Sequence, residues 1–372
     1  MSEELYSRIL GCMVGNAIGD AFGGAVEFMK ADRVREMAGG TWVQEFLPYS
    51  KLHKEHEFGT WAPAPPRGTG TDDTRNNHIF AECVIRNRGQ INSQLLAIEY
   101  LERYRDRDIF YPRHAALAEK QYHWLHDLAC AHLGMRESFG GRPAWVVSAK
   151  GTAFPMLIGL IQLAFAGLLF CGEPEQAYVK AFELDFPDVG YAQDATGMMA
   201  AMVSAALRGG ISGKQMVQVG LETNPFGYVD TVLGGRVMAN RVKSFLELAD
   251  KAEDDQALVS ALAREVAHLH PYDPVDVLGV PMAAIYASDG DAVRSIIMAA
   301  NDRYLDEQGE LRQLRDVDCT AGVAGALVGA LRGVSAFPDD WVADVMAANK
   351  ELYGIDIEAN ARKFYQAVYG NG

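Results

Sequence analysis

The sequence has few cysteines, and their pattern excludes a disulfide scaffold. The five cysteines are scattered, odd in number and without a Cys-x-x-Cys spacing. Such usage fits a reducing cytoplasm better than a framework of disulfides. The first residues carry acids and no basic cluster ahead of an apolar run, so we expect no signal peptide and a cytoplasmic protein.

Basic charge is also scarce, with 34 Lys and Arg against 49 Asp and Glu and a formal net charge of −15. A protein that binds the phosphate backbone of nucleic acid needs a basic face, so we expect no direct nucleic-acid binding. The acidic balance still permits a phosphorylated small molecule as ligand, if metal ions or a local basic patch offset the repulsion.

Only one long uncharged run occurs, from Phe154 to Cys171, and it is near the lower limit for a membrane span. Pro155 near its start, Gln162 within it and the lack of flanking basic residues favour a buried core helix instead. We therefore expect no membrane association.

The alternation of apolar and polar residues that marks a half-buried strand is absent, whereas helical patterns follow one another along the chain. No linker, charge block or short repeat divides the sequence, which predicts one all-α domain over residues 1–372. Residues 30–67 have the pattern of a long loop, which is either functional or mobile. The expected helices are Tyr6–Phe28, Arg75–Arg88, Gln90–Arg105, Ala115–Gly134, Phe154–Gly172, Glu175–Leu184, Ala192–Arg208, Ser212–Leu221, Val232–Asp250, Gln256–Leu269, Asp276–Ser288, Asp291–Asn301, Thr320–Arg332 and Asp356–Tyr369.

Small residues recur every fourth position in the first expected helix, at Gly11, Gly15, Gly19 and Gly23. Each glycine in a helix interior costs about 1 kcal/mol against alanine, so four of them indicate a steric requirement. The resulting flat stripe predicts that another backbone packs closely against this helix.

Two adjacent carboxylates, Asp72 and Asp73, stand between Thr71 and Thr74 just before an expected helix. One interpretation is an ordinary solvated helix start, because Thr and Asp cap helices and acids favour the positive end of the dipole. The other is a site for a hard divalent cation, which binds carboxylate and hydroxyl oxygens.

A second acidic group lies far along the chain, where Asp316 and Asp318 precede Cys319, Thr320 and a helix rich in small residues. Capping is again the simpler interpretation of this pair alone. If the two helix starts converge, however, four aspartates gather at one point. That much negative charge repels itself without cations, which makes a two-metal site physically sensible.

The spacing of His123, His126 and Cys130, with His132 nearby, would permit zinc ligation from one helix. The alternative, which we favour, is a polar helix face beside a loop.

Three blocks of the sequence together resemble the ADP-ribosylglycohydrolase family, which includes dinitrogenase reductase-activating glycohydrolase. They are GCMVGNAIGDAFGGAVEF near the start, GTGTDDT, and DVDCTAGVAGALVGALRG near the end. The resemblance implies an all-α orthogonal bundle with a binuclear Mg²⁺ or Mn²⁺ site in a cleft. It also implies hydrolysis of the N- or O-glycosidic bond of ADP-ribose on a modified target.

Carried onto this sequence, the resemblance implies metal ligands at Thr71, Asp72 and Asp73 on one side and at Asp316 and Asp318 on the other. Glu27 matches the family's acid near the scissile bond. The water would be activated by Glu27 or by a metal-bridging aspartate, Asp73 or Asp318.

The sequence departs from the family at Cys319, where a threonine usually supplies a hydroxyl ligand. A thiol is a soft ligand and a poor match for Mg²⁺. Either Cys319 holds one metal loosely, or the helix start shifts so that the Thr320 hydroxyl becomes the metal ligand.

Two alternatives to the glycohydrolase hypothesis remain open. One is a family member with altered specificity for another N-riboside or nucleotide. The other is a binding or structural relative without turnover, although such a scaffold has no physical reason to keep so repulsive a cluster of acids.

Overall fold

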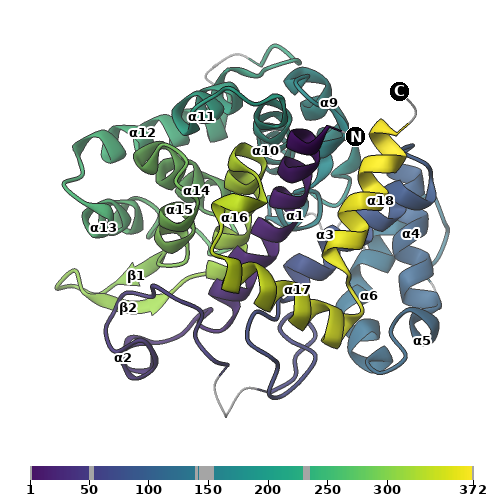
Figure 1. The fold of residues 1–372 in the computed structure, drawn as a ribbon, viewed down its shortest axis with the longest axis horizontal. Coiled ribbons are helices and arrows are strands. Elements are labelled where there is room, and N and C mark those ends of the chain that lie inside the picture. Colours follow the sequence, from purple (N-terminus) through teal and green to yellow (C-terminus); the bar gives the residue numbers. More distant parts are fainter. Residues whose placement is uncertain (1, 50–53, 139–140, 142–154, 229–234, 371–372) are drawn as a thin grey trace.

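The computed structural model describes residues 2–49, 54–138, 141, 155–228 and 235–370, and helices dominate it (Figure 1). This confirms the all-α prediction. The helices of the first part are α1 (Glu3–Gly24), α2 (Ala31–Ala38), α3 (Asp72–Arg86), α4 (Ser93–Arg105), α5 (Arg107–Phe110), α6 (Ala115–His132), α8 (Ile158–Gln162), the 3₁₀ turn η1 (Ala166–Leu169), α9 (Pro174–Leu184) and α10 (Tyr191–Arg208).

The second part contains one short hairpin among its helices. Its elements are α11 (Gly213–Glu222), α12 (Val237–Lys251), α13 (Asp255–Glu265), α14 (Pro274–Ser288), α15 (Ala292–Ala299), β1 (Arg303–Leu305), β2 (Leu311–Leu314), α16 (Val317–Arg332), the 3₁₀ turn η2 (Val334–Ala336), α17 (Asp339–Tyr353) and α18 (Ile357–Tyr369). The antiparallel strands β1 and β2 have only three and four residues, too few for an alternating pattern to show in the sequence.

Helices α1 and α16 lie side by side at the centre of the molecule (Figure 1). A Cβ atom on Gly15 would lie 2.1 Å from the carbonyl oxygen of Gly325, and one on Gly19 would lie 1.8 Å from that of Ala321. The prediction of a close backbone neighbour is confirmed. Because Gly11 meets Gly329 while Gly23 meets Val317, the helices run antiparallel, and the end of α1 faces the start of α16.

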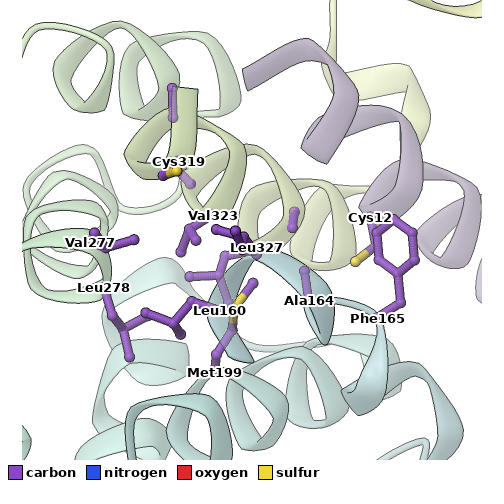
Figure 2. Packing of buried hydrophobic residues seen from close by; sticks show 14 of the residues in the cluster. Cys12, Leu160, Ala164, Phe165, Met199, Val277, Leu278, Cys319, Val323 and Leu327 are labelled. Atoms are coloured by element: carbon purple, nitrogen blue, oxygen red, sulfur yellow. The ribbon is translucent and has the colours of Figure 1, made fainter. Parts of the chain in front are cut away.

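Apolar side chains on the remaining faces of α16 build the core around this pair. Figure 2 shows Val323 and Leu327 of α16 near Leu278 of α14 and Met199 of α10. On the other side, α3 and α18 pack against α1. The core therefore fixes the helix starts that carry the acidic motifs.

Three boundaries differ from the predictions in ways that affect the acids. Helix α1 ends at Gly24, so Glu27 lies in the turn that follows it. Helix α3 begins at Asp72 and α16 begins at Val317, which places Asp72, Asp73 and Asp318 in first turns.

The prediction of a single helix for the apolar run is wrong within the described residues. The chain there forms α8, a break, and then η1, although its side chains are buried as expected. Apolar composition reports burial but not the interruptions in a helix; Phe154 itself lies outside the described residues. In the described part of the chain, every helix is too short or too polar to cross a membrane.

Candidate active site

Thr71 forms the N-cap of α3, but this helix start is buried rather than solvated. The Thr71 side chain accepts a hydrogen bond from the Asp73 amide, and Thr71 and Asp73 are each 1% exposed. Asp72 is 8% exposed. The capping interpretation is therefore correct for Thr71 and does not explain why two carboxylates are kept out of water.

Asp20 of α1 holds this helix start in place. Its carboxylate accepts hydrogen bonds from the Thr71 amide at 2.9 Å and from the Thr74 amide at 2.9 Å. It also accepts from the hydroxyls of both threonines, and it is fully buried. Asp20 thus ties the end of α1 to the start of α3.

The start of α16 supplies the second set of acids. Asp318 Oδ2 lies 3.2 Å from the Thr71 hydroxyl oxygen, so the two distant motifs are in direct contact. The Cys319 thiol donates to Asp73 Oδ2 at 3.3 Å, and the Cys319 amide donates to Asp318 Oδ1 at 2.9 Å. The expected convergence of the helix starts is present in the structure.

Asp316 precedes the helix and makes no side-chain capping bond there. Its Oδ2 atom is buried and has no hydrogen-bond partner among the described residues. The capping interpretation of this aspartate is therefore not supported, and a buried orphan oxygen calls for a ligand.

Glu27 lies beside Asp316 and Asp318, in the turn after α1. Hydrogen bonds to β2 and to the residue after it fix this turn. The Phe28 amide donates to the Arg315 carbonyl at 3.1 Å, and the Gln313 side chain donates to the Phe28 carbonyl at 2.7 Å. Phe28 has a φ of 51°, which is uncommon outside glycine. These contacts keep Glu27 beside Asp316.

Arg315, the residue before Asp316, is itself anchored by charge. Its Nε atom lies 2.6 Å from Asp276 Oδ2 and 3.4 Å from Asp302 Oδ2, and all three side chains are buried. Its guanidinium also stacks over the ring of Tyr304. This ion cluster fixes the backbone from which Asp316 projects.

Helix α17, which was not among the predicted helices, supports the loop before α3. Asn349 accepts from the Gly70 amide at 3.1 Å and donates to the Gly68 carbonyl at 3.2 Å. The Tyr353 hydroxyl donates to the Gly70 carbonyl at 2.7 Å. The acids are thus held from three sides, by α1, α16 and α17.

The clustered acids are hard to ionise together. Burial, opposed in part by Arg75, raises the pKa of Asp72 to about 8, and burial together with Asp20 raises the pKa of Asp318 to about 7. The pKa values of Asp73 and Glu27 are raised well above their ordinary range, by burial first and then by the nearby Asp318 carboxylate.

The acids form two groups that share Asp318. One contains Glu27, Asp316 and Asp318; the other contains Asp73, Asp318 and Cys319; within each group the possible ligand atoms lie within 4.8 Å of one another. Thr320, the alternative to Cys319, donates its hydroxyl to the Ala299 carbonyl at 3.0 Å. The side chain that meets the acids is therefore that of Cys319.

A cleft of about 1020 Å³ opens over both groups and includes Glu27, Asp72, Asp73, Asp316, Asp318 and Cys319 in its lining. Basic side chains of Arg33, Lys54 and His56 lie along it. Aromatic rings and an apolar wall complete it, from Phe28, Phe58, Trp124, Tyr272, Leu157, Ile158 and Ile161.

The histidine pattern on α6 gathers around a different residue from the one expected. His126 Nδ1 lies 3.1 Å from Asp127 Oδ1, and His123 Nε2 lies 3.7 Å from Asp127 Oδ2. Asp127, rather than Cys130, completes the group that could hold a metal ion.

Sequence reasoning missed Asp20 as part of the site, although an acid next to the glycine stripe and seven residues before Glu27 was a signal. It also missed the cleft residues Arg33, Lys54 and His56. Residues 30–67 were expected to form a long loop, and this is wrong at Arg33, which lies in helix α2. Lys54 and His56 lie outside any helix or strand, as expected.

Comparison with known proteins agrees with this geometry. The sequence model of the ADP-ribosylglycohydrolase family matches residues 1–372. No curated protein sequence matches the chain. Among solved structures 43 chains match; one, described as an ADP-ribosylglycohydrolase-related protein complex, has a TM-score of 0.60 and 20% identity, covering 98% of this chain and 99% of that one. At that identity the likeness shows the fold, whereas the family match over the whole chain shows the membership: this protein belongs to the ADP-ribosylglycohydrolase family.

Proposed function

We propose that this protein is a metal-dependent glycohydrolase that cleaves the N- or O-glycosidic bond of ADP-ribose on a modified target. The observation that carries the proposal is the pair of acidic groups, joined by Asp318, at the floor of a cleft of about 1020 Å³. Family membership gives the reaction class.

The residues present fit divalent cations. Asp316 Oδ2 is buried without a hydrogen-bond partner among the described residues, and the neighbouring acids have raised pKa values. A cation would offset both the unpartnered oxygen and the cost of ionising the acids together. It supplies the missing partner and favours the ionised carboxylates. Asp72, Asp73, Asp316 and Asp318 would hold two divalent ions, with Thr71 contributing its hydroxyl and Cys319 lying against the second position. Mg²⁺ or Mn²⁺ suits a position whose ligands are all oxygen. Thr320 is left out of this set because its hydroxyl lies against the Ala299 carbonyl, whereas the Cys319 side chain is the one that contacts the acids.

The charged and aromatic residues that line the cleft suit ADP-ribose. Arg33, which also pairs with Glu36, and Lys54 line the cleft and can neutralise a diphosphate, which the acidic chain as a whole would repel. The rings of Phe58 and Trp124 offer surfaces on which an adenine could stack.

Bound ions would hold the ribose hydroxyls and lower the pKa of a water molecule. Glu27 is the least buried of the acids and lines the cleft, so it can accept the proton of the attacking water. Carboxylates such as Asp73 and Asp318 would stabilise the positive charge that develops on the sugar.

The test is calorimetry of the metal-stripped protein with Mg²⁺ or Mn²⁺, followed by ADP-ribose, and then turnover of ADP-ribosylated arginine and serine peptides. We expect metal binding, metal-dependent ADP-ribose binding and release of ADP-ribose from at least one peptide. Failure to bind either ion would contradict the proposal. Metal binding without ADP-ribose binding would instead favour the alternative of another N-riboside or nucleotide as substrate.

A further inference from the structure

The two acidic groups differ in one chemical respect. Every side chain in the group of Glu27, Asp316 and Asp318 offers oxygen, whereas the group of Asp73, Asp318 and Cys319 includes a sulfur atom. Because Asp318 belongs to both, the groups are neighbours, and a carboxylate could bridge ions placed in them.

The sulfur lies at the edge of the hydrophobic core, where the core meets the acids. Cys319 lies at the start of α16, where the apolar face formed by Val323 and Leu327 comes to an end (Figure 2). Its Sγ atom is 3.3 Å from Asp73 Oδ2, and the residue is 5% exposed. The thiol therefore does more than fill space, because it donates a weak hydrogen bond to a carboxylate of the acidic group.

An independent observation indicates that the cluster suits a cation. The Oδ2 atom of Asp316, a residue 2% exposed, has no hydrogen-bond partner among the described residues, although it lies in the group adjoining that of Cys319. Buried carboxylate oxygens in native proteins are ordinarily satisfied by a donor or a metal ion.

The ligand sets select different ions. Mg²⁺ binds oxygen ligands and avoids sulfur, whereas Zn²⁺ is bound by thiolate and carboxylate together. We propose that the two metal positions are unequal: Glu27, Asp316 and Asp318 take Mg²⁺ or Mn²⁺, and Asp73, Asp318 and Cys319 take Zn²⁺ through the sulfur. The inference rests on the proposed function only in placing metal ions at this cluster. On binding, the S–H proton leaves to solvent and the sulfur donates an electron pair to the ion, with no change in oxidation state.

Cobalt(II) provides the probe, because it replaces Zn²⁺ and its bond to thiolate gives an absorption band that oxygen ligands do not give. The full-length, metal-stripped protein should show this band on addition of Co²⁺, and Zn²⁺ should abolish it by competition. Cys319→Thr and Cys319→Ser should both lack the band and bind Zn²⁺ at least about tenfold more weakly in equilibrium dialysis. Cys171→Ser, which changes a free, half-buried cysteine outside the cleft lining, should keep the band.

A Co²⁺ complex without the sulfur band, or a band that survives in both Cys319 variants, would overturn the inference. Circular dichroism of each variant confirms that it is folded before its spectrum is compared. The outcome is separable from that of the proposed function. A sulfur band without hydrolysis of any ADP-ribosylated peptide supports the metal assignment and contradicts the activity, whereas hydrolysis without the band does the reverse.

Discussion

The amide of Thr71 donates a hydrogen bond to Asp20, and its hydroxyl lies 2.8 Å from Oδ1 of the same carboxylate. This contact spans 51 positions of the sequence and sets where α3 begins relative to α1. Asp20 thus places Thr71 and the acids after it.

The Asp20→Asn change keeps the shape of the side chain but replaces one acceptor oxygen with a donor group. The Thr71 and Thr74 amides would then compete for one oxygen, so the start of α3 should shift. We expect Mg²⁺ or Mn²⁺ affinity to fall by about 10- to 100-fold, the range found when residues that orient metal ligands are altered. Calorimetry measures this, with the exposed Asp32→Asn as control; equal affinities in the two variants would contradict the role of Asp20.

The Asp73→Ala change should abolish turnover while the fold survives, because the carboxylate that it removes faces the cleft and contacts the Cys319 thiol. A metal ion stabilises a transition state by several kcal/mol, so kcat should fall by at least about a thousandfold. The measurement is release of ADP-ribose from the peptide that the wild type cleaves best. Undiminished turnover, with the exposed Asp108→Ala as the matched control, would remove Asp73 from the mechanism.

The Gly15→Ala change should destabilise the protein severely. The new methyl group would lie 2.1 Å from the carbonyl oxygen of Gly325, where neither backbone can yield without moving a helix. We expect the free energy of unfolding to fall by about 3 kcal/mol or more in urea titrations. Gly40→Ala, where a Cβ meets nothing within 4 Å, should change it by less than about 0.5 kcal/mol. Similar losses in both variants would show that the helix contact is not the cause.

The metal-free protein should lose stability as the pH rises from about 4 to about 8. The pKa of Asp72 rises to about 8 and the pKa of Asp318 to about 7 in the folded state, against 3.8 ordinarily. The folded state therefore keeps protons that the unfolded chain has released, and its advantage disappears as the pH passes through these values. Urea unfolding in the presence of a chelator measures how steeply the free energy of unfolding falls with pH. The Asp72→Asn change should make this fall less steep. Adding Mg²⁺ at pH 8 should restore about 2.7 kcal/mol when the ion is at 100 times its Kd. Stability that stays level in the chelated protein over this range would show that these carboxyls do not retain their protons on folding.

The Arg315→Met change should leave Asp276 and Asp302 buried without their cation. Breaking a buried ion pair in this way costs about 3–5 kcal/mol, measured as the free energy of unfolding. Arg312→Met, in the same hairpin but exposed, is the control and should cost less than about 0.5 kcal/mol. If the two losses of stability were equal, the ion cluster around Arg315 could not be what anchors the chain after β2.

The sequence was sufficient to predict the parts of the site that short patterns encode. The glycine stripe of α1 required a close backbone, and the pairs of acids at two helix starts predicted a cation site wherever those starts converge. The choice between Cys319 and Thr320 depended on helix phase, which is fixed by where α16 begins and has no mark in the local sequence.

Other parts depend on tertiary contacts that leave no local pattern. Arg33 lines the cleft from helix α2, and Lys54 lines it from a stretch without helix or strand, so neither position follows from a local pattern. The break between α8 and η1 lies in uniformly apolar sequence. Helix α17 is different, because its boundaries are marked in the sequence although it was not predicted. Acids lie in its first turn, and Gly354 adopts the left-handed region at its end.

The glycine contact between α1 and α16 also has a consequence for the order of events during synthesis. The hydrogen bond from Asn16 to the Gly322 carbonyl joins positions 306 residues apart, so the first helix emerges from the ribosome long before its partner exists. The glycine face of this helix has no packing partner, and the acidic site cannot assemble, until α16 has been translated. The nascent protein is therefore expected to be inactive until α16 has been synthesised.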